Sequence, residues 1–163
     1  MKGVKVEFKE VPPIKVISIR KVVSKDQILN LLDDLLCWAF EKIVGVGDPH
    51  FVIIHEDYGN TADVEACIPL VDEEVPEEDE NVKIKEIPKS NVAFVVHRGG
   101  YALLEEKINW LFGWLEKNKI RFKKSYRIVY VVDYFDTKDK SKYVTEIQVP
   151  IEEEIDKLNK IQQ

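Results

Sequence analysis

A carboxylate in the middle of an apolar strand is the residue of this chain best suited to chemistry. The segment 143–151 is rich in Val, Ile, Thr and Tyr, which predicts a β-strand. Alternation along a strand places Glu146 on the opposite face from its neighbours Thr145 and Ile147. A carboxylate held among apolar groups can bind a cation or act as a general acid or base.

Aromatic residues in the second half of the chain are candidates to line a site with Glu146. Tyr101 begins a predicted helix, and Tyr130 lies in a predicted strand. Trp110 and Trp114 are four residues apart, so they share one face of that helix. Rings stack on flat ligands and a carboxylate pairs with positive charge, so this set favours an aromatic or lipophilic cation. The open alternatives are that Glu146 faces solvent, that both tryptophans are core residues, and that Tyr101 only starts the helix.

Four sequence matches in the same order, roughly 75 to 81 residues apart, indicate an internal duplication. The matched segments are 6–12 with 82–88, 35–38 with 111–114, 57–58 with 133–134, and 63–70 with 144–151. In the last match Glu65 corresponds to Glu146, which makes Glu65 a candidate ligand-binding residue in the first half. Each half predicts the order strand–strand–helix–strand–strand.

The duplication predicts an α+β fold: a tandem β-β-α-β-β repeat with a pseudo-twofold axis, an eight-strand antiparallel sheet and two main helices. We expect a single domain over 1–163, with half-repeats at about 4–71 and 82–151. Residues 72–81 are rich in acids, which predicts a solvated linker. Residues 152–163 predict a short C-terminal helix. The groove where the two halves meet is the expected place for a ligand.

Helical periodicity positions the aromatic candidates. Residues 101–117 predict a helix with an apolar stripe that includes Ile108, Leu111 and Leu115. The two tryptophans lie about 100° further round the helix, on a second stripe. This helix therefore has a second surface, rich in indole, that needs a partner.

Composition and charge limit the classes of partner. The chain has 163 residues, of which 45% are hydrophobic and 33% are charged, enough for a globular core under a charged surface. The 24 Lys and Arg against 30 Asp and Glu give a net charge of −6, which opposes binding to nucleic acid. No window approaches about 18 uncharged apolar residues, so no membrane partner is expected either.

We expect no cofactor and no metal. His97 has no second His or Cys nearby, and His50 and His55 lack a Cys or Asp in metal-ligand spacing. Neither a Gly-x-Ser-x-Gly elbow nor a phosphate-binding glycine loop is present. Cys37 and Cys67 lie in apolar settings, which predicts two buried thiols. Together with an N-terminus that lacks a signal peptide, this favours a cytoplasmic location.

The duplicated motifs resemble the GyrI-like small-molecule-binding family, which includes the gyrase-inhibitory protein and the effector-binding domains of multidrug-responsive transcription regulators. The resemblance runs from Val4 to about Ile151. It is carried by residues 82–88, His-Arg-Gly-Gly-Tyr at 97–101, residues 110–115 and Thr-Glu-Ile-Gln-Val-Pro-Ile at 145–151. It implies a tandem β-β-α-β-β fold with a ligand groove between the halves.

The resemblance also implies roles for residues. In the family an acidic residue of the last strand engages cationic or aromatic ligands, and Glu146 holds that position here. The family's His-x-Gly-Pro-Tyr passage appears with Gly100 in place of Pro and keeps Tyr101. The corresponding first-half stretch, 20–24, has neither Gly nor Tyr, which leaves Glu65 without that partner. No residues remain for a helix-turn-helix domain, so we expect a stand-alone member.

Three functions follow as hypotheses. The first is a binding protein for an aromatic or lipophilic, positively charged compound. The second is a hydrolase of reactive electrophiles, with Glu146 as acid or base and Tyr101 as hydrogen-bond donor. The third is a protein modulator, by analogy with gyrase inhibition, in which the acidic segment 72–80 imitates nucleic acid. The sequence names neither the ligand nor a protein partner such as gyrase.

Overall fold

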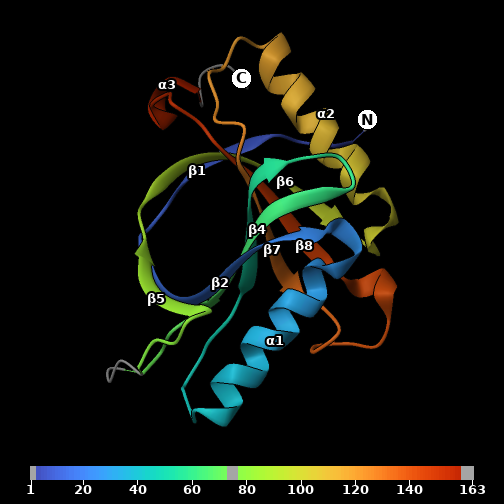
Figure 1. The fold of residues 1–163 in the computed structure, drawn as a ribbon. Helices are drawn as coiled ribbons and strands as arrows, with labels where there is room; N and C mark the ends of the chain where they lie inside the picture. Colours follow the sequence, from blue (N-terminus) through green and yellow to red (C-terminus); the bar gives the residue numbers. More distant parts are fainter. Residues whose placement is uncertain (1–2, 73–76, 159–163) are drawn as a thin grey trace. The chain divides into compact units, whose positions relative to one another are not determined.

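The computed structural model describes residues 3–72 and 77–158. The first half holds β1 (Glu7–Val11), β2 (Ile14–Ser24), α1 (Ile28–Glu41), β3 (His50–Asp57) and β4 (Thr61–Pro69). The second half holds β5 (Val82–Ile87), β6 (Ser90–Arg98), α2 (Leu104–Lys117), β7 (Tyr126–Val132), β8 (Val144–Pro150) and α3 (Ile155–Leu158) (Figure 1). These elements confirm the predicted α+β class and the tandem β-β-α-β-β order.

The strands fall into two compact units. Unit 1 is Met1–Pro12 with Lys89–Gln163, and unit 2 is Pro13–Pro88. The strand order is β1-β6-β8-β7 in unit 1 and β3-β4-β2-β5 in unit 2. Every neighbouring pair within a unit is antiparallel.

The first strand of each repeat is exchanged. β1 pairs with β6 of the second repeat, and β5 pairs with β2 of the first repeat, so in Figure 1 the yellow-green β5 lies beside the blue β2. The sequence duplication therefore does not coincide with the strand pairing. A prediction from the repeat alone would have left each first strand with its own half.

Each main helix covers its own unit. α1 packs on β2 and β4 through an apolar face, and α2 packs on β6. On α2 the buried residues are Ile108, Leu111 and Leu115, which confirms the predicted stripe. The ring of Trp114 lies 6.2 Å from that of Phe8, so α2 lies on the face of the unit 1 sheet that carries Phe8.

Three other predictions concern the cysteines, the linker and the C-terminal helix. Cys67 is buried, but Cys37 is exposed, so the prediction of two buried thiols is wrong for Cys37: it lies on the outer side of α1. Of the predicted acidic linker, 73–76 lie outside the described residues. Nearby, Asp79 accepts a hydrogen bond from the indole of Trp38 at 2.7 Å. Of the predicted C-terminal helix, 159–163 also lie outside them.

In the described part of the chain, no helix is long and apolar enough to cross a membrane.

Candidate functional site

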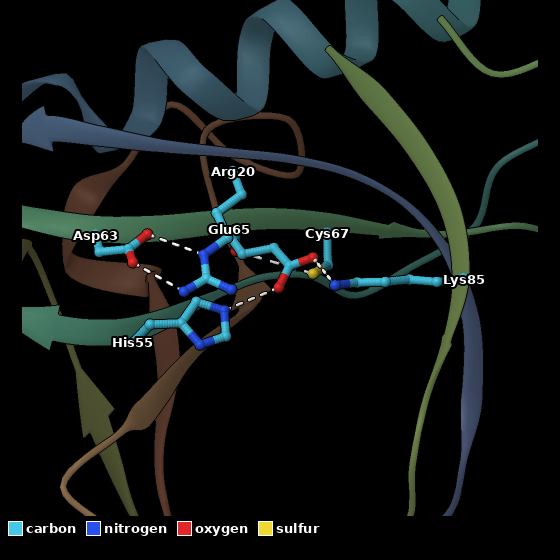
Figure 2. Close-up of polar contacts among 6 residues, drawn as sticks. All are labelled: Arg20, His55, Asp63, Glu65, Cys67 and Lys85. Atoms are coloured by element: carbon cyan, nitrogen blue, oxygen red, sulfur yellow. Dashed lines mark hydrogen bonds and ion pairs between the residues drawn. The ribbon is translucent and has the colours of Figure 1, made fainter. Parts of the chain in front are cut away.

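Glu65 lies at the centre of a polar network on the unit 2 sheet (Figure 2). Its side chain is only 2% exposed. One oxygen accepts a hydrogen bond from His55 Nε2 at 2.8 Å, and the other lies 2.5 Å from Lys85 Nζ. Ser18 donates a further hydrogen bond to the carboxylate. The carboxylate is thus buried and fully partnered by this chain's own side chains.

These partners hold Glu65 in its charged form. Burial by itself raises the pKa of the Glu65 carboxyl, but the hydrogen bonds from His55, Lys85 and Ser18 outweigh burial and lower the pKa to about 2. The ionised carboxylate is therefore part of the folded structure over the whole physiological pH range.

A second ion pair flanks Glu65. The guanidinium of Arg20 donates to both oxygens of Asp63, at 3.0 and 2.8 Å. This pairing holds the pKa of Asp63 below its usual value. Figure 2 shows the pair beside Glu65, with His55 arriving from β3. His55 reaches the network because it lies two residues after Ile53, the residue opposite Glu65, and therefore on the same face of the sheet; the register of β3 shifts at this point, between Ile54 and Glu56.

Glu146 has a sparser environment in unit 1. Its carboxylate lies 2.5 Å from Lys9 Nζ of β1 and accepts a hydrogen bond from Gln148 Nε2 at 2.9 Å. The side chain is 14% exposed. The ammonium of Lys9 also lies 4.3 Å from the centre of the Phe94 ring, within range of a cation–π interaction. Glu146 is therefore half-buried next to a cation and an aromatic ring.

The strand registers make the two glutamates equivalent. Glu65 lies between Arg20 of β2 and Ile53 of β3, and Glu146 lies in the same way between Val96 of β6 and Val129 of β7. The lysines correspond as well. Lys85 on β5 lies opposite Val16 of β2, and Lys9 on β1 lies opposite Val92 of β6. Each unit thus contains one buried or half-buried glutamate paired with a lysine from an exchanged strand.

The surroundings of the two glutamates differ at three equivalent positions. Unit 2 has Ser18, Arg20 and His55 where unit 1 has Phe94, Val96 and Val131. Val131 stands at the register irregularity of β7, as His55 does in β3. Val96 and Val131 are 37% and 46% exposed. Polar groups saturate Glu65, whereas exposed apolar surface surrounds Glu146.

Three tyrosines of unit 1 form a separate cluster. The ring of Tyr101 lies 5.9 Å from that of Tyr130, edge to face, and 5.4 Å from that of Tyr143, stacked. Burial raises the pKa of both Tyr101 and Tyr130, and the nearby charge of Asp133 adds to the effect. Neither phenol can serve as a base near neutral pH.

Buried polar atoms without partners lie around this cluster. Within the described residues, His97 Nδ1, Thr145 Oγ1 and the hydroxyl of Tyr101 have no hydrogen-bond partner. His97 Nε2 donates to the carbonyl of Gly100 at 2.7 Å, and this bond anchors the turn between β6 and α2. The turn thereby positions Tyr101 against the sheet.

The structure brings only some of the sequence-predicted site residues together. Tyr130 lies opposite Thr145 and Val129 lies opposite Glu146, so Tyr130 and Glu146 project from opposite faces of the sheet. Tyr101 packs on the Tyr130 side.

Trp114 also lies on the face away from Glu146, because its ring contacts Phe8, and Phe8 and Lys9 project in opposite directions. Trp110 is half-buried on α2. Lys9, Phe94, Val96 and Val131, which surround the acid, were not predicted.

No metal centre is formed by the described residues: they contain no group of three or more His, Cys, Asp and Glu side chains arranged to hold an ion. The histidine nearest an acid, His55, already donates to Glu65.

A sequence model of the GyrI-like small molecule binding domain matches residues 4–152. The chain belongs to this family. The match covers both repeats, so both glutamates lie within the GyrI-like domain. No curated protein matches the chain in sequence.

Solved structures with the same fold include EcmrR in its complex with DNA. The TM-score is 0.83 at 24% identity, over 94% of this chain and 59% of that chain, so this GyrI-like domain spans little more than half of that protein's length. The isolated EcmrR C-terminal domain gives a TM-score of 0.76 at 23% identity, over 93% of this chain and 99% of that chain.

A third structure, SAV2435 bound to tetraphenylphosphonium, gives a TM-score of 0.61 at 9% identity, over 91% of this chain and 94% of that chain. At these identities the likeness is one of fold.

Proposed function

We propose that this GyrI-like domain binds an aromatic or lipophilic cation on the face of unit 1 that carries Glu146. The observation that supports this most directly is the replacement of Ser18, Arg20 and His55 of unit 2 by apolar residues around Glu146. The carboxylate attracts the positive charge of a ligand, and burial of the ligand's hydrocarbon against the exposed apolar surface stabilises the complex further.

The chemistry of the position favours a cation over an anion or a neutral polar ligand. The carboxylate offers an opposite charge at reduced exposure, where its interaction with a cation is weakly screened. Phe94 adds the negative face of an aromatic ring. Val96 and Val131 offer hydrocarbon but no hydrogen bonds, so the bulk of the ligand should be apolar.

A protein of the same fold supports the ligand class. SAV2435 was solved bound to tetraphenylphosphonium, a cation enclosed by four phenyl rings. We propose that compounds of this class suit the Glu146 face of the present domain. Unit 2 serves as framework in this proposal, because the donors around Glu65 leave the acid no capacity for a ligand.

The sequence also predicted aromatic ligand contacts and a second activity. Tyr101, Tyr130, Trp110 and Trp114 as ligand contacts remain predictions, as does a groove between the half-repeats. The hydrolase hypothesis needs Glu146 and Tyr101 at one reacting centre, and their placement on different faces gives it no support.

Thermal unfolding and calorimetry with tetraphenylphosphonium test the proposal. At a ligand concentration about one hundred times the Kd, we expect stabilisation by about 2.7 kcal/mol. Glu146→Gln keeps the shape but removes the charge, so we expect it to weaken binding at least about tenfold. Tetraphenylborate, which has the same shape and the opposite charge, should not bind measurably.

Two further variants test whether the ligand binds beside Glu146 rather than beside Glu65 or at the tyrosine cluster. Glu65→Gln changes the equivalent residue of unit 2 and should leave the affinity unchanged, and Tyr101→Phe should do the same if the tyrosine cluster does not contact the ligand. Equal binding of the cation by the wild-type protein and Glu146→Gln would contradict the proposal. A loss of binding in Tyr101→Phe alone would move the site to the tyrosine face.

A further inference from the structure

We infer that Lys9 is a specificity-determining residue: its ammonium occupies the cation position beside Glu146 and must be displaced by a ligand. The inference rests on the proposed function, since it concerns the same carboxylate. It goes further by explaining which cations are selected and which are refused.

The contacts of Lys9 reproduce those that a bound cation would make. Its Nζ lies 2.5 Å from Glu146 Oε1 and 4.3 Å from the centre of the Phe94 ring. Carboxylate and aromatic face are the two groups that recognise a lipophilic cation. The chain's own ammonium therefore already neutralises the acid when no ligand is bound.

Displacement of this ammonium needs no change of fold. Lys9 is held by backbone pairing of β1 with β6, where it lies opposite Val92. Its side chain is 41% exposed, so a rotation about its flexible stem carries the ammonium into water. The strand, the Phe94 ring and Glu146 can stay in place while one cation replaces another.

An attached competitor sets a threshold for binding. Lys9 is present at a high effective concentration because it belongs to the same chain. A small ammonium ion offers no more than Lys9 does and cannot compete. A large aromatic cation also buries hydrocarbon against Val96 and Val131, and this additional stabilisation favours the exchange.

Unit 2 supplies the matched control. Lys85 makes the same contact with Glu65, also at 2.5 Å and with a side chain 42% exposed. Glu65 keeps His55 and Ser18 as partners after Lys85 is removed. Lys9→Met and Lys85→Met therefore delete the same ion pair from two equivalent positions, only one of which is proposed to bind a ligand.

The experiment compares Kd values of tetraphenylphosphonium and tetramethylammonium for the wild-type protein, Lys9→Met and Lys85→Met. Removing the competitor should tighten tetraphenylphosphonium binding about five- to tenfold in Lys9→Met, with no change in Lys85→Met. Tetramethylammonium should bind Lys9→Met measurably and the wild-type protein not at all. Lys9→Gln, which keeps a polar end, serves as the second variant if Lys9→Met does not fold.

A direct readout follows Lys9 itself. After reductive ¹³C-methylation of the lysines, the Lys9 signal should be displaced by the Phe94 ring in the free protein. It should move to the position of an exposed lysine when tetraphenylphosphonium binds, while the Lys85 signal stays fixed. Assignment uses the signal missing from Lys9→Met or Lys9→Gln.

The possible outcomes separate the two ideas. Binding that depends on Glu146 but is unchanged or weaker in both Lys9 variants overturns the role of Lys9 and leaves the proposed function standing. Binding of tetraphenylphosphonium only after Lys9 is replaced supports the role of Lys9 as a competitor and contradicts the proposed function of the wild-type protein. If neither the wild-type protein nor the Lys9 variants bind either cation, the inference and the proposed function fall together.

Discussion

Glu65 and Glu146 occupy equivalent places in the two units, yet the chain treats them differently. Glu65 is 2% exposed and is bound by His55, Lys85 and Ser18, whereas Glu146 is 14% exposed and is bound by Lys9 and Gln148. The duplicated sheet provides the same carboxylate twice. The residues around it decide whether that carboxylate stabilises the fold or remains accessible.

Residues on neighbouring strands carry this difference. A serine, an arginine and a histidine at the positions around Glu65 become a phenylalanine and two valines around Glu146. Buried charges are tolerated only when they are paired and hydrogen-bonded. Glu65 can therefore be buried only because these polar residues of unit 2 surround it. Without that set, unit 1 keeps Glu146 nearer to solvent.

The largest expected effect is on stability in unit 2. Glu65→Gln removes a buried charge and replaces one of its two acceptor oxygens, so that either Lys85 or His55 loses its acceptor; the free energy of unfolding should fall by about 3 kcal/mol. Glu146→Gln, with more exposed partners, should lower it by about 1 kcal/mol or less. Urea unfolding monitored by circular dichroism measures both. An equal loss of unfolding free energy in the two variants would contradict the view that Glu65 stabilises the fold while Glu146 remains accessible.

The free energy of unfolding should depend on acid pH through Glu65 more than through Glu146. The pKa of Glu65 is about 2 in the folded chain against an ordinary 4.5, so the unfolded chain binds the proton first as the pH falls. The contribution of Glu65 is therefore complete above about pH 5 and is lost as the pH falls from about 4.5 towards 2; it amounts to about 3 kcal/mol.

Urea unfolding at a series of pH values measures this loss. Glu65→Gln should flatten the stability profile in the acid range, while Glu146→Gln should keep most of the wild-type slope. A wild-type slope in Glu65→Gln would assign the acid sensitivity to other carboxyls.

A smaller effect, on ligand affinity, is expected when residues around Glu146 are replaced by their counterparts around Glu65. Phe94→Ser together with Val96→Arg gives Glu146 the neighbours that Ser18 and Arg20 provide in unit 2. The new arginine and the lost ring should weaken tetraphenylphosphonium binding about tenfold. Calorimetry measures the change, and a variant with Val22→Arg, at an exposed position of β2, controls for added charge. Undiminished affinity would show that these neighbours do not define the site.

Much of the fold could be predicted because its signals are local. Strand alternation, helical stripes and the duplication depend on residues near one another in sequence or on a direct repeat, and they gave the right class and element order. The equivalence of Glu65 and Glu146 was also visible, since each is the third residue of a matched segment and stands four residues before a proline.

The neighbours of Glu146 could not be predicted because they depend on which strands pair. Lys9 reaches Glu146 only through the exchange of β1 onto β6, across more than half of the chain. The register shift of β3 between Ile54 and Glu56, where His55 stands, leaves no clear mark in the sequence. The one usable signal was that Lys9 and Lys85 occupy the same place in matched segments.

The exchanged first strands also govern the order in which the chain can complete itself during synthesis. Residues 13–88 of unit 2 are contiguous, so that unit has all its strands once β5 leaves the ribosome. β1 precedes its neighbour β6 by roughly 80 residues, which makes their pairing a long-range closure. Lys9 travels with that strand. Glu146 lies on β8 and Lys9 on β1, so this ion pair can form only after all eight of these strands have been synthesised.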